Sequence, residues 1–247
     1  MNKTKIDWCD STWNPITGCL HNCPYCYARG IAKRFAGIAD LPFYEDVDPK
    51  EYYGFIYDNE KDIYDVFRQQ ERRSEKGTIV KAAYPFGFAP TFHRYRLDEY
   101  KKKETRTIFV SSMGDLFGEW VPDEWIKKVF EACESTPQHR YVFLTKNPKR
   151  YMELEIQGIL PEGNNYWFGS TATTQTEYFG ESGYHNTFIS IEPICGSFDK
   201  IDNPVKKAGW VIIGAETGNR VGKVIPEREC GLIISLRIAG RQGHQFL

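Results

Sequence analysis

The sequence predicts an α/β protein built as a (β/α) barrel of the TIM type, partial or with a truncated C-terminal end, plus an inserted segment. The first observation is a repeat of short apolar segments without alternation, a pattern typical of strands covered on both faces in a parallel sheet. The second is their number, since about seven such strands in 247 residues suit a barrel. A doubly wound open sheet is the alternative, but it would need a glycine-rich phosphate loop after the first strand.

Length and charge limit the classes of protein that fit. The 247 residues are enough for one large domain, and we predict a single domain over 1–247 with an insertion at about 38–83. The net charge of −1 excludes a basic field over the whole molecule, but a local basic patch remains open. Because the chain has no apolar run of roughly 18 residues and no signal-type N-terminus, we expect no membrane contact and a cytoplasmic location.

The segment from Trp13 to Arg29, WNPITGCLHNCPYCYAR, holds three of the seven cysteines. A short strand is expected to lead into them. Their spacing is C-x3-C-x2-C, and three thiolates on one loop can hold three irons of a cubane cluster. Fe–S clusters usually have four cysteine ligands, so the fourth iron would be open to another molecule. The three cysteines are Cys19, Cys23 and Cys26.

The four other cysteines are scattered, and each is interpreted as a small buried hydrophobe. A disulfide framework is a poor interpretation for a chain of this size without a secretory signal. These cysteines are Cys9, Cys133, Cys195 and Cys230.

Downstream of the cysteines, apolar residues recur at helical spacing and predict a helix closed by Gly37. Residues 38–83 are rich in charged residues and Tyr, and they are interpreted either as a solvated surface excursion or as a lid that contacts substrate. Within them, Asn59 is expected to cap a helix that runs to Arg73.

Residues 84–106 predict a strand around Phe86–Phe92 followed by a short basic helix. Such a basic run is either a solvated face or a phosphate contact. The basic residues of this run are His93, Arg94, Arg96, Lys101, Lys102, Lys103 and Arg106.

The α/β rhythm is clearest in the second half. Pro122 and Pro148 each open a helix, and the first has Asp123 and Glu124 in its first turn. Strands are predicted at 108–112, 141–145, 166–170, 187–191 and 210–214. In a barrel, the residues after the strands would gather at one mouth. These are Cys19, Asp115, Lys146, Ser170, Glu192 and Glu216.

The cysteine loop with Tyr25 before its third cysteine resembles the radical S-adenosylmethionine superfamily. More narrowly, the chain resembles a branch of unknown function encoded by phages and bacteria. The shared stretches run from Trp8 to about Glu229 and cover most of the chain. They are WNPITGC, CPYCYA, FAPTFHRYRL, SSMGDLFGEWVP, FLTKNP, SIEP and VIIGAE.

The resemblance implies a TIM-type barrel and a 4Fe–4S cluster on Cys19, Cys23 and Cys26. S-adenosylmethionine would occupy the open iron, and reductive cleavage would yield a 5′-deoxyadenosyl radical that acts on an unknown substrate, with a nucleotide or nucleic acid among the options. A flavodoxin- or ferredoxin-like protein would donate the electron.

The resemblance also implies roles for single residues. Tyr25 would flank the cluster and the adenine, and Asp115 would accept the methionine ammonium. The remaining contacts to cofactor or substrate would come from Ser170, Thr171, Glu192, Gly214 and Glu216. No catalytic residue is assigned. Outside the cysteines, a structural role at a strand end is an equal alternative for each.

The chain departs from the family pattern at Thr173 and Thr174, where a Glu-Asn pair is expected, and after Glu229, where a closing helix and strand are expected. These departures support the alternative of a non-catalytic or truncated relative that binds a partner. A structural zinc site is a further alternative. It would need a fourth ligand, and His21 is too close in sequence to complete a good tetrahedron with all three cysteines.

Overall fold

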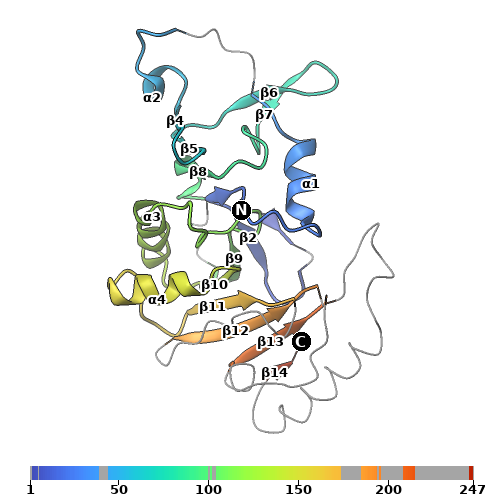
Figure 1. The fold of residues 1–247 in the computed structure, drawn as a ribbon, viewed down its shortest axis with the longest axis vertical. Helices are drawn as coiled ribbons and strands as arrows, with labels where there is room; N and C mark the ends of the chain where they lie inside the picture. The colour runs from blue at the N-terminus through green and yellow to red at the C-terminus, as the bar shows by residue number, and fades with distance from the viewer. Residues whose placement is uncertain are drawn as a thin grey trace. The chain divides into compact units, whose positions relative to one another are not determined.

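The structure is a computed structural model, and it describes residues 2–4, 6–38, 44–99, 101, 104–173, 185–193, 195, 208–214 and 245–246. The chain divides into two compact units, Met1–His139 and Arg140–Leu247 (Figure 1). Each unit has its own strands, helices and buried core, and we describe them in turn.

The first unit contains three sets of paired strands. The strands β2 (Ser11–Trp13) and β9 (Thr107–Val110) are parallel, and β1 (Asn2–Lys3) pairs antiparallel with β2. A four-stranded sheet has the order β3 (Ile16–Thr17), β8 (Thr91–His93), β5 (Ile63–Val66) and β4 (Phe55–Asp58). The third is a hairpin of β6 (Glu71–Arg73) and β7 (Ile79–Lys81). The helices are α1 (Tyr27–Arg34), α2 (Pro49–Tyr52), the 3-10 helix η1 (Arg94–Arg96) and α3 (Asp123–Glu134).

Two large aromatic side chains lie in the core of this unit. Trp13 is fully buried, and its indole Nε1 donates a hydrogen bond of 2.8 Å to the Arg96 carbonyl oxygen. Phe92 is also fully buried, and its ring lies 5.2 Å from that of Trp125 on α3. The apolar stripe of α3 is buried, and the contact of Trp125 with Phe92 on β8 packs this helix onto the four-stranded sheet.

The helix predicted from Asn59 to Arg73 is wrong. The structure has the turn after β4, then β5 and β6, there instead. Antiparallel pairing of β4 with β5 requires a turn, and the Asp58 side chain makes it by accepting from the backbone N–H groups of Glu60 and Lys61. Aromatic and β-branched residues flank this turn, and they favour strands over helix.

The second unit contains five parallel strands in the order of the chain. They are β10 (Arg140–Thr145), β11 (Tyr166–Thr171), β12 (Asn186–Ile191), β13 (Trp210–Ile213) and β14 (Gln245–Phe246). The helix α4 (Lys149–Ile156) begins after Pro148 as predicted, and its Tyr151 hydroxyl donates to the Gly169 carbonyl oxygen at 3.0 Å. The predicted strands at 141–145, 166–170, 187–191 and 210–214 are therefore present, to within a residue or two at their ends.

The predicted barrel is wrong: the fold is mixed α/β with open sheets. In the described ranges, no strand pairing closes the parallel strands into a ring, and four α-helices are too few for an outer layer. A second, largely antiparallel sheet also has no place in a barrel. Continuous apolar strands predict a covered parallel sheet, but the same pattern occurs in open and in closed sheets, because closure depends on strand tilt and stagger. The single domain with its 38–83 insertion stays a prediction.

Candidate functional site

The three clustered cysteines lie on the loop between β3 and α1, in the first unit. All three are half-buried and none forms a disulfide. The loop leaves the sheet at Gly18 and enters the helix at Cys26, which is the N-cap of α1. There the Cys26 Sγ accepts a hydrogen bond of 3.4 Å from the backbone N–H of Arg29. Its backbone is therefore held at both ends by regular structure.

Gly18 binds the start of this loop to the segment after β9. Its backbone N–H donates to the Met113 carbonyl oxygen at 2.9 Å, and it forms a parallel bridge with Gly114. Both positions need glycine: Gly18 has φ +85°, and a Cβ on Gly114 would lie 2.8 Å from the Gly18 carbonyl oxygen. This close approach places Asp115 beside the cysteine loop.

Asp115 is buried, and both oxygens of its carboxylate are hydrogen-bonded. Its Oδ2 lies 2.8 Å from Nε2 of His21, which is itself in the cysteine loop, and its Oδ1 accepts from the Phe117 N–H at 3.0 Å. The His21 ring packs edge-on against Trp120, with centroids 4.9 Å apart. A fixed carboxylate–histidine pair therefore lies next to the three thiols.

The pKa of the Cys19 thiol is raised by burial and by the acidic groups around it. Burial raises the pKa of the Cys19 thiol to about 12, and the negative charges of Asp115, Cys23 and Cys26 act in the same direction. The three cysteine sulfurs fit an iron–sulfur cluster or a zinc ion, because both are bound by thiolates. Across the described residues, however, no group of three His, Cys, Asp or Glu side chains is already arranged to hold a metal ion.

Two serines and an asparagine near this loop were missed from the sequence. Ser111, directly after β9, has φ +58°, and its buried hydroxyl has no hydrogen-bond partner among the described residues. The side-chain oxygen of Asn14 accepts from the Ser112 hydroxyl at 3.1 Å and from the Met113 N–H at 3.0 Å. Strained residues and unpartnered buried polar groups are both enriched at functional sites. No sequence pattern predicts the positive φ of Ser111 or its unpartnered hydroxyl, because a positive φ at serine is uncommon.

The second unit brings several other predicted residues together. Ser170 and Thr171 end β11, and Thr171 is in register with Ser190 on β12. The Glu192 carboxylate accepts from the Ser190 hydroxyl at 3.1 Å, and burial raises the pKa of Glu192 above its ordinary value. Gly214 leaves room for that carboxylate, since a Cβ there would lie 2.8 Å from the Glu192 Cγ.

Several positions singled out from the sequence lie outside the described residues: Glu216, Thr174, Lys102, Lys103 and Cys230. Tyr25 is half-buried, and its predicted role beside the adenine stays a prediction. The same holds for the predicted cofactor roles of the residues on β11, β12 and β13.

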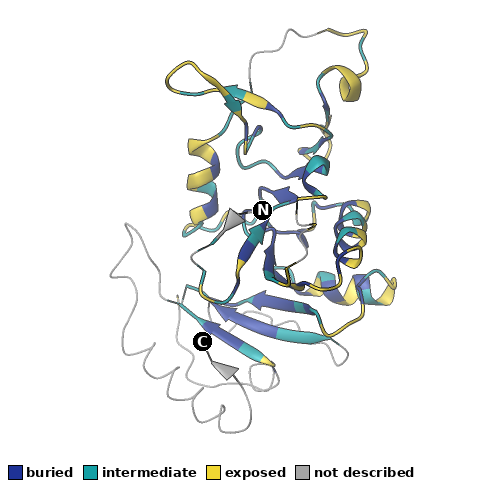
Figure 2. Ribbon diagram, turned by 180° about the vertical axis from the view of Figure 1, so that it is seen from behind, coloured by how far each residue is buried: buried dark blue, intermediate teal, exposed yellow. Residues whose placement is uncertain are grey.

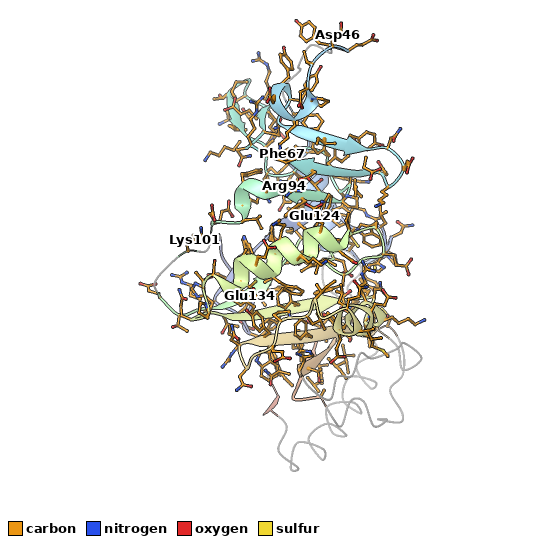
Figure 3. All side chains as sticks on the ribbon, turned by 90° about the vertical axis from the view of Figure 1, so that its left-hand side faces the viewer. Asp46, Phe67, Arg94, Lys101, Glu124 and Glu134 are labelled. Carbon is orange, nitrogen blue, oxygen red and sulfur yellow. The ribbon has the colours of Figure 1, made fainter. Side chains whose placement is uncertain are left out.

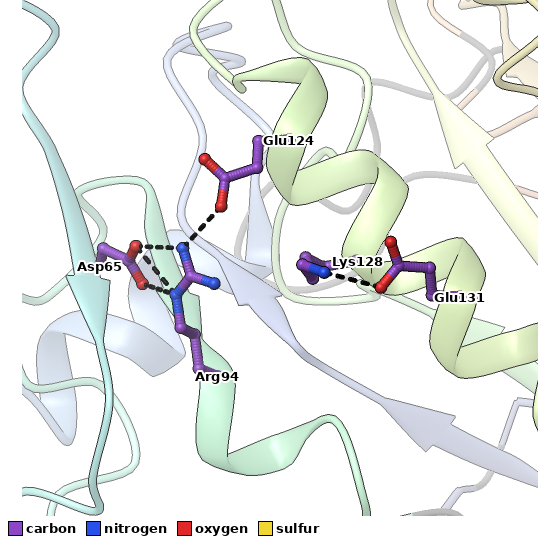
Figure 4. Close-up of polar contacts among 5 residues, drawn as sticks. All are labelled: Asp65, Arg94, Glu124, Lys128 and Glu131. Atoms are coloured by element: carbon purple, nitrogen blue, oxygen red, sulfur yellow. Dashed lines mark hydrogen bonds and ion pairs between the residues drawn. The ribbon is translucent and has the colours of Figure 1, made fainter.

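Two arginines of the basic run, Arg94 and Arg96, are engaged within the protein. The Arg94 guanidinium binds both oxygens of Asp65 and contacts Glu124 at 3.1 Å (Figure 4). It also lies over the Phe67 ring, and Figure 3 labels both residues. Arg96 is buried and donates to the carbonyl oxygens of Asn14 and Ala83. These two arginines connect segments of the first unit, so the phosphate contact considered for them is not available.

His93 supports the strand that leads into the loop. It is fully buried, with its Nε2 2.9 Å from the Thr17 hydroxyl and its Nδ1 3.2 Å from the Tyr95 hydroxyl. Burial, together with the positive charge of Arg96, lowers the pKa of His93 well below 6.5. The folded state therefore holds this imidazole neutral.

We expect His93 to contribute to acid destabilisation. Below pH 6.5 the unfolded chain binds a proton at this histidine that the folded chain does not, so its contribution is intact above pH 6.5 and is lost as the pH falls. The free energy of unfolding should fall by up to about 1.4 kcal/mol per pH unit from this group. Urea unfolding between pH 6.5 and about pH 5 should show a shallower decline in His93→Gln. Equal declines in both proteins would contradict this assignment.

The chain is thus a mixed α/β protein with a three-cysteine loop beside a buried carboxylate–histidine pair. Residues 3–231 match the family described as "Protein of unknown function (DUF5131)", and the chain belongs to this family. No curated protein and no solved structure matched the chain. Of the helices within the described ranges, none combines the length and the apolar character needed to cross a bilayer.

Proposed function

We propose that the chain is a radical S-adenosylmethionine enzyme in which Cys19, Cys23 and Cys26 hold a 4Fe–4S cluster. The observation that carries the proposal is the presence of three half-buried, uncrosslinked thiols on one loop whose two ends are fixed. When bound and reduced, such a cluster supplies the electron that cleaves S-adenosylmethionine to a 5′-deoxyadenosyl radical. The resemblance of the cysteine spacing supports the same assignment.

The residues of the chain would bind the cluster and S-adenosylmethionine and orient them for the reaction. The Arg29 N–H bond to the Cys26 sulfur is of the kind that tunes a cluster potential. Asp115, fixed by His21 and buried, is proposed to accept the ammonium group of S-adenosylmethionine. Tyr25 is proposed to lie beside the adenine.

The other contacts to cofactor or substrate are proposed for Ser170, Thr171, Glu192, Gly214 and Glu216. An external one-electron donor of the flavodoxin or ferredoxin type would reduce the cluster. Three reduced thiols suit the cytoplasm, which we propose as the location.

Anaerobic reconstitution tests this proposal. Protein incubated with iron, sulfide and reductant should become brown and gain a broad absorption near about 400 nm from thiolate-ligated iron. After reduction it should convert S-adenosylmethionine to 5′-deoxyadenosine, measured by chromatography. Protein that binds neither iron nor sulfide under these conditions would contradict the proposal.

A structural metal site in a non-catalytic relative is the second candidate, and the His21–Asp115 pair favours it. A ligating histidine commonly donates its other ring N–H to a carboxylate, and Asp115 lies 2.8 Å from the His21 Nε2. Structural zinc prefers four ligands. Contrary to the expectation from sequence spacing, this candidate takes His21 Nδ1 as the fourth ligand beside the three cysteines, because the bond from Nε2 to Asp115 would fix the imidazole ring. One equivalent of zinc without sulfide, in protein purified without oxygen, would favour this candidate, and His21→Ala should then weaken zinc binding by about tenfold or more.

A further inference from the structure

The small net charge of the chain hides a separation of charge within the first unit. Residues 27–37 contain three basic residues and no acidic one, and residues 68–81 contain five basic and two acidic residues. By contrast, residues 44–66 contain eight acidic and two basic residues. A net charge near zero therefore coexists with local potentials of opposite sign.

The two basic segments are in contact. The guanidinium of Arg72, on β6, lies over the Phe35 ring at the end of α1, 5.9 Å from its centroid. Just beyond the helix, Ala36 forms a parallel bridge with Tyr84, and the Gly37 N–H donates to the Pro85 carbonyl oxygen at 3.2 Å. Figure 2 shows exposed stretches on both α1 and the β6–β7 hairpin. We call this surface the basic face; it comprises Lys33, Arg34, Phe35, Arg72, Arg73, Lys76 and Lys81.

The cations of the basic face are not neutralised within the described part of the chain. Lys33, Arg34, Arg73, Lys76 and Lys81 are exposed, and none of them forms an ion pair with a described carboxylate. The two acidic residues nearby, Glu71 and Glu75, are exposed on the same hairpin. Elsewhere in the unit, Arg94, Arg106 and Lys128 each have a carboxylate partner. Unpaired like charges repel one another, so a bound polyanion would stabilise this surface.

Apolar side chains lie among these cations. Phe35 is 42% exposed, Ile31 is 38% exposed and Ile79 is 45% exposed. An arginine over an exposed aromatic ring, with lysines on the same two segments, is a combination that suits single-stranded nucleic acids, because cations follow the phosphates and bases stack on rings and guanidinium planes. An acidic protein would neutralise the cations, but its carboxylates would not stack on the exposed Phe35 ring as nucleic-acid bases do.

We propose that the basic face binds single-stranded nucleic acid. The proposal is independent of any metal, because no residue of the face is a cysteine of the loop. If the proposed radical chemistry also holds, then α1, which begins directly after Cys26, would place a bound strand next to the loop. A nucleic acid would in that case be the substrate class, which is the only part that rests on the proposed function.

Fluorescence anisotropy with the metal-free full chain tests binding alone. A labelled single-stranded oligonucleotide of about 16 nucleotides is titrated with protein at several salt concentrations. Lys33→Glu with Arg34→Glu, and separately Arg73→Glu with Lys76→Glu, should each weaken binding by about tenfold or more and flatten the salt dependence, because fewer counterions are released. Phe35→Ala should weaken binding by about tenfold through lost stacking.

The matched control is Lys61→Glu with Lys127→Glu, which changes the net charge equally at exposed lysines of the same unit outside the basic face. It should leave affinity within about twofold of the parent, since the face is intact. Thermal unfolding confirms that each variant is folded. The proposal is overturned if the parent does not bind at low salt, if the control loses as much affinity as the two variants, or if polyglutamate competes as well as unlabelled oligonucleotide. The last outcome would point to an acidic protein partner.

Discussion

Replacing Cys23 with alanine is expected to abolish the cluster chemistry proposed for the loop. With one thiolate gone, one iron of the cluster loses its protein ligand, and cluster assembly fails. Because changes outside the ligand set already cost ten- to a hundredfold in metal affinity or activity, we expect at least about a hundredfold loss of 5′-deoxyadenosine formation. Iron and sulfide content after reconstitution should fall together with the absorption near about 400 nm.

Cys195→Ala is the matched control for this experiment. Cys195 is exposed, so the prediction that it is buried is wrong. It lies in the second unit, outside the loop, and its removal should leave iron content and turnover unchanged. Retention of both colour and cleavage by Cys23→Ala would exclude the cluster assignment. If the parent protein holds one equivalent of zinc and no sulfide, and Cys23→Ala loses that zinc, the loop is instead a structural metal site.

The elements with strong local signals were predictable from the sequence. The helix α3 has Pro122 before it, acidic residues in its first turn and an apolar stripe, and all of these point to the same structure. The strands β10, β11 and β12 are apolar runs bounded by polar residues and turns. For these elements, local propensity and burial agree, so a single sequence suffices.

The failures occurred where long-range pairing decides the structure. The segment from Asn59 to Arg73 has apolar residues at spacings that suit either a helix or strands, and β5 forms because it pairs with β4 and β8. The prediction that the parallel strands close into a barrel was wrong for the same reason. Strand order and stagger depend on contacts between distant segments, and local patterns do not encode them.

The candidate site was predictable only in part. The cysteine spacing identified the loop, and Asp115 was expected near it. The physical cause of that proximity is the contact between Gly18 and Gly114, not a barrel mouth. The His21–Asp115 pair and the unpartnered Ser111 hydroxyl depend on backbone conformations that become visible only in three dimensions.

Gly18→Ala is expected to be among the most destabilising single changes in the first unit. Two costs combine there. A side chain at φ +85° occupies the left-handed region, and its Cβ would clash with the Ala89 carbonyl group and lie 2.8 Å from the Phe88 carbonyl oxygen. These neighbours are backbone atoms and cannot rotate away, so the loop or the sheet must shift. We expect a loss of at least about 3 kcal/mol in the free energy of unfolding, measured with urea.

Gly77→Ala separates the two costs, because it is matched in backbone conformation but not in contacts. Gly77 has φ +78°, and a Cβ there would meet nothing within 4 Å. It should therefore lose only the conformational part, about 1 kcal/mol. Equal losses in the two variants would mean that the Gly18 backbone relaxes freely and that its contact with Gly114 does not fix the cysteine loop. A larger loss in Gly18→Ala, accompanied by lower iron binding after reconstitution, would show that the stability of this contact and the metal affinity of the loop are coupled.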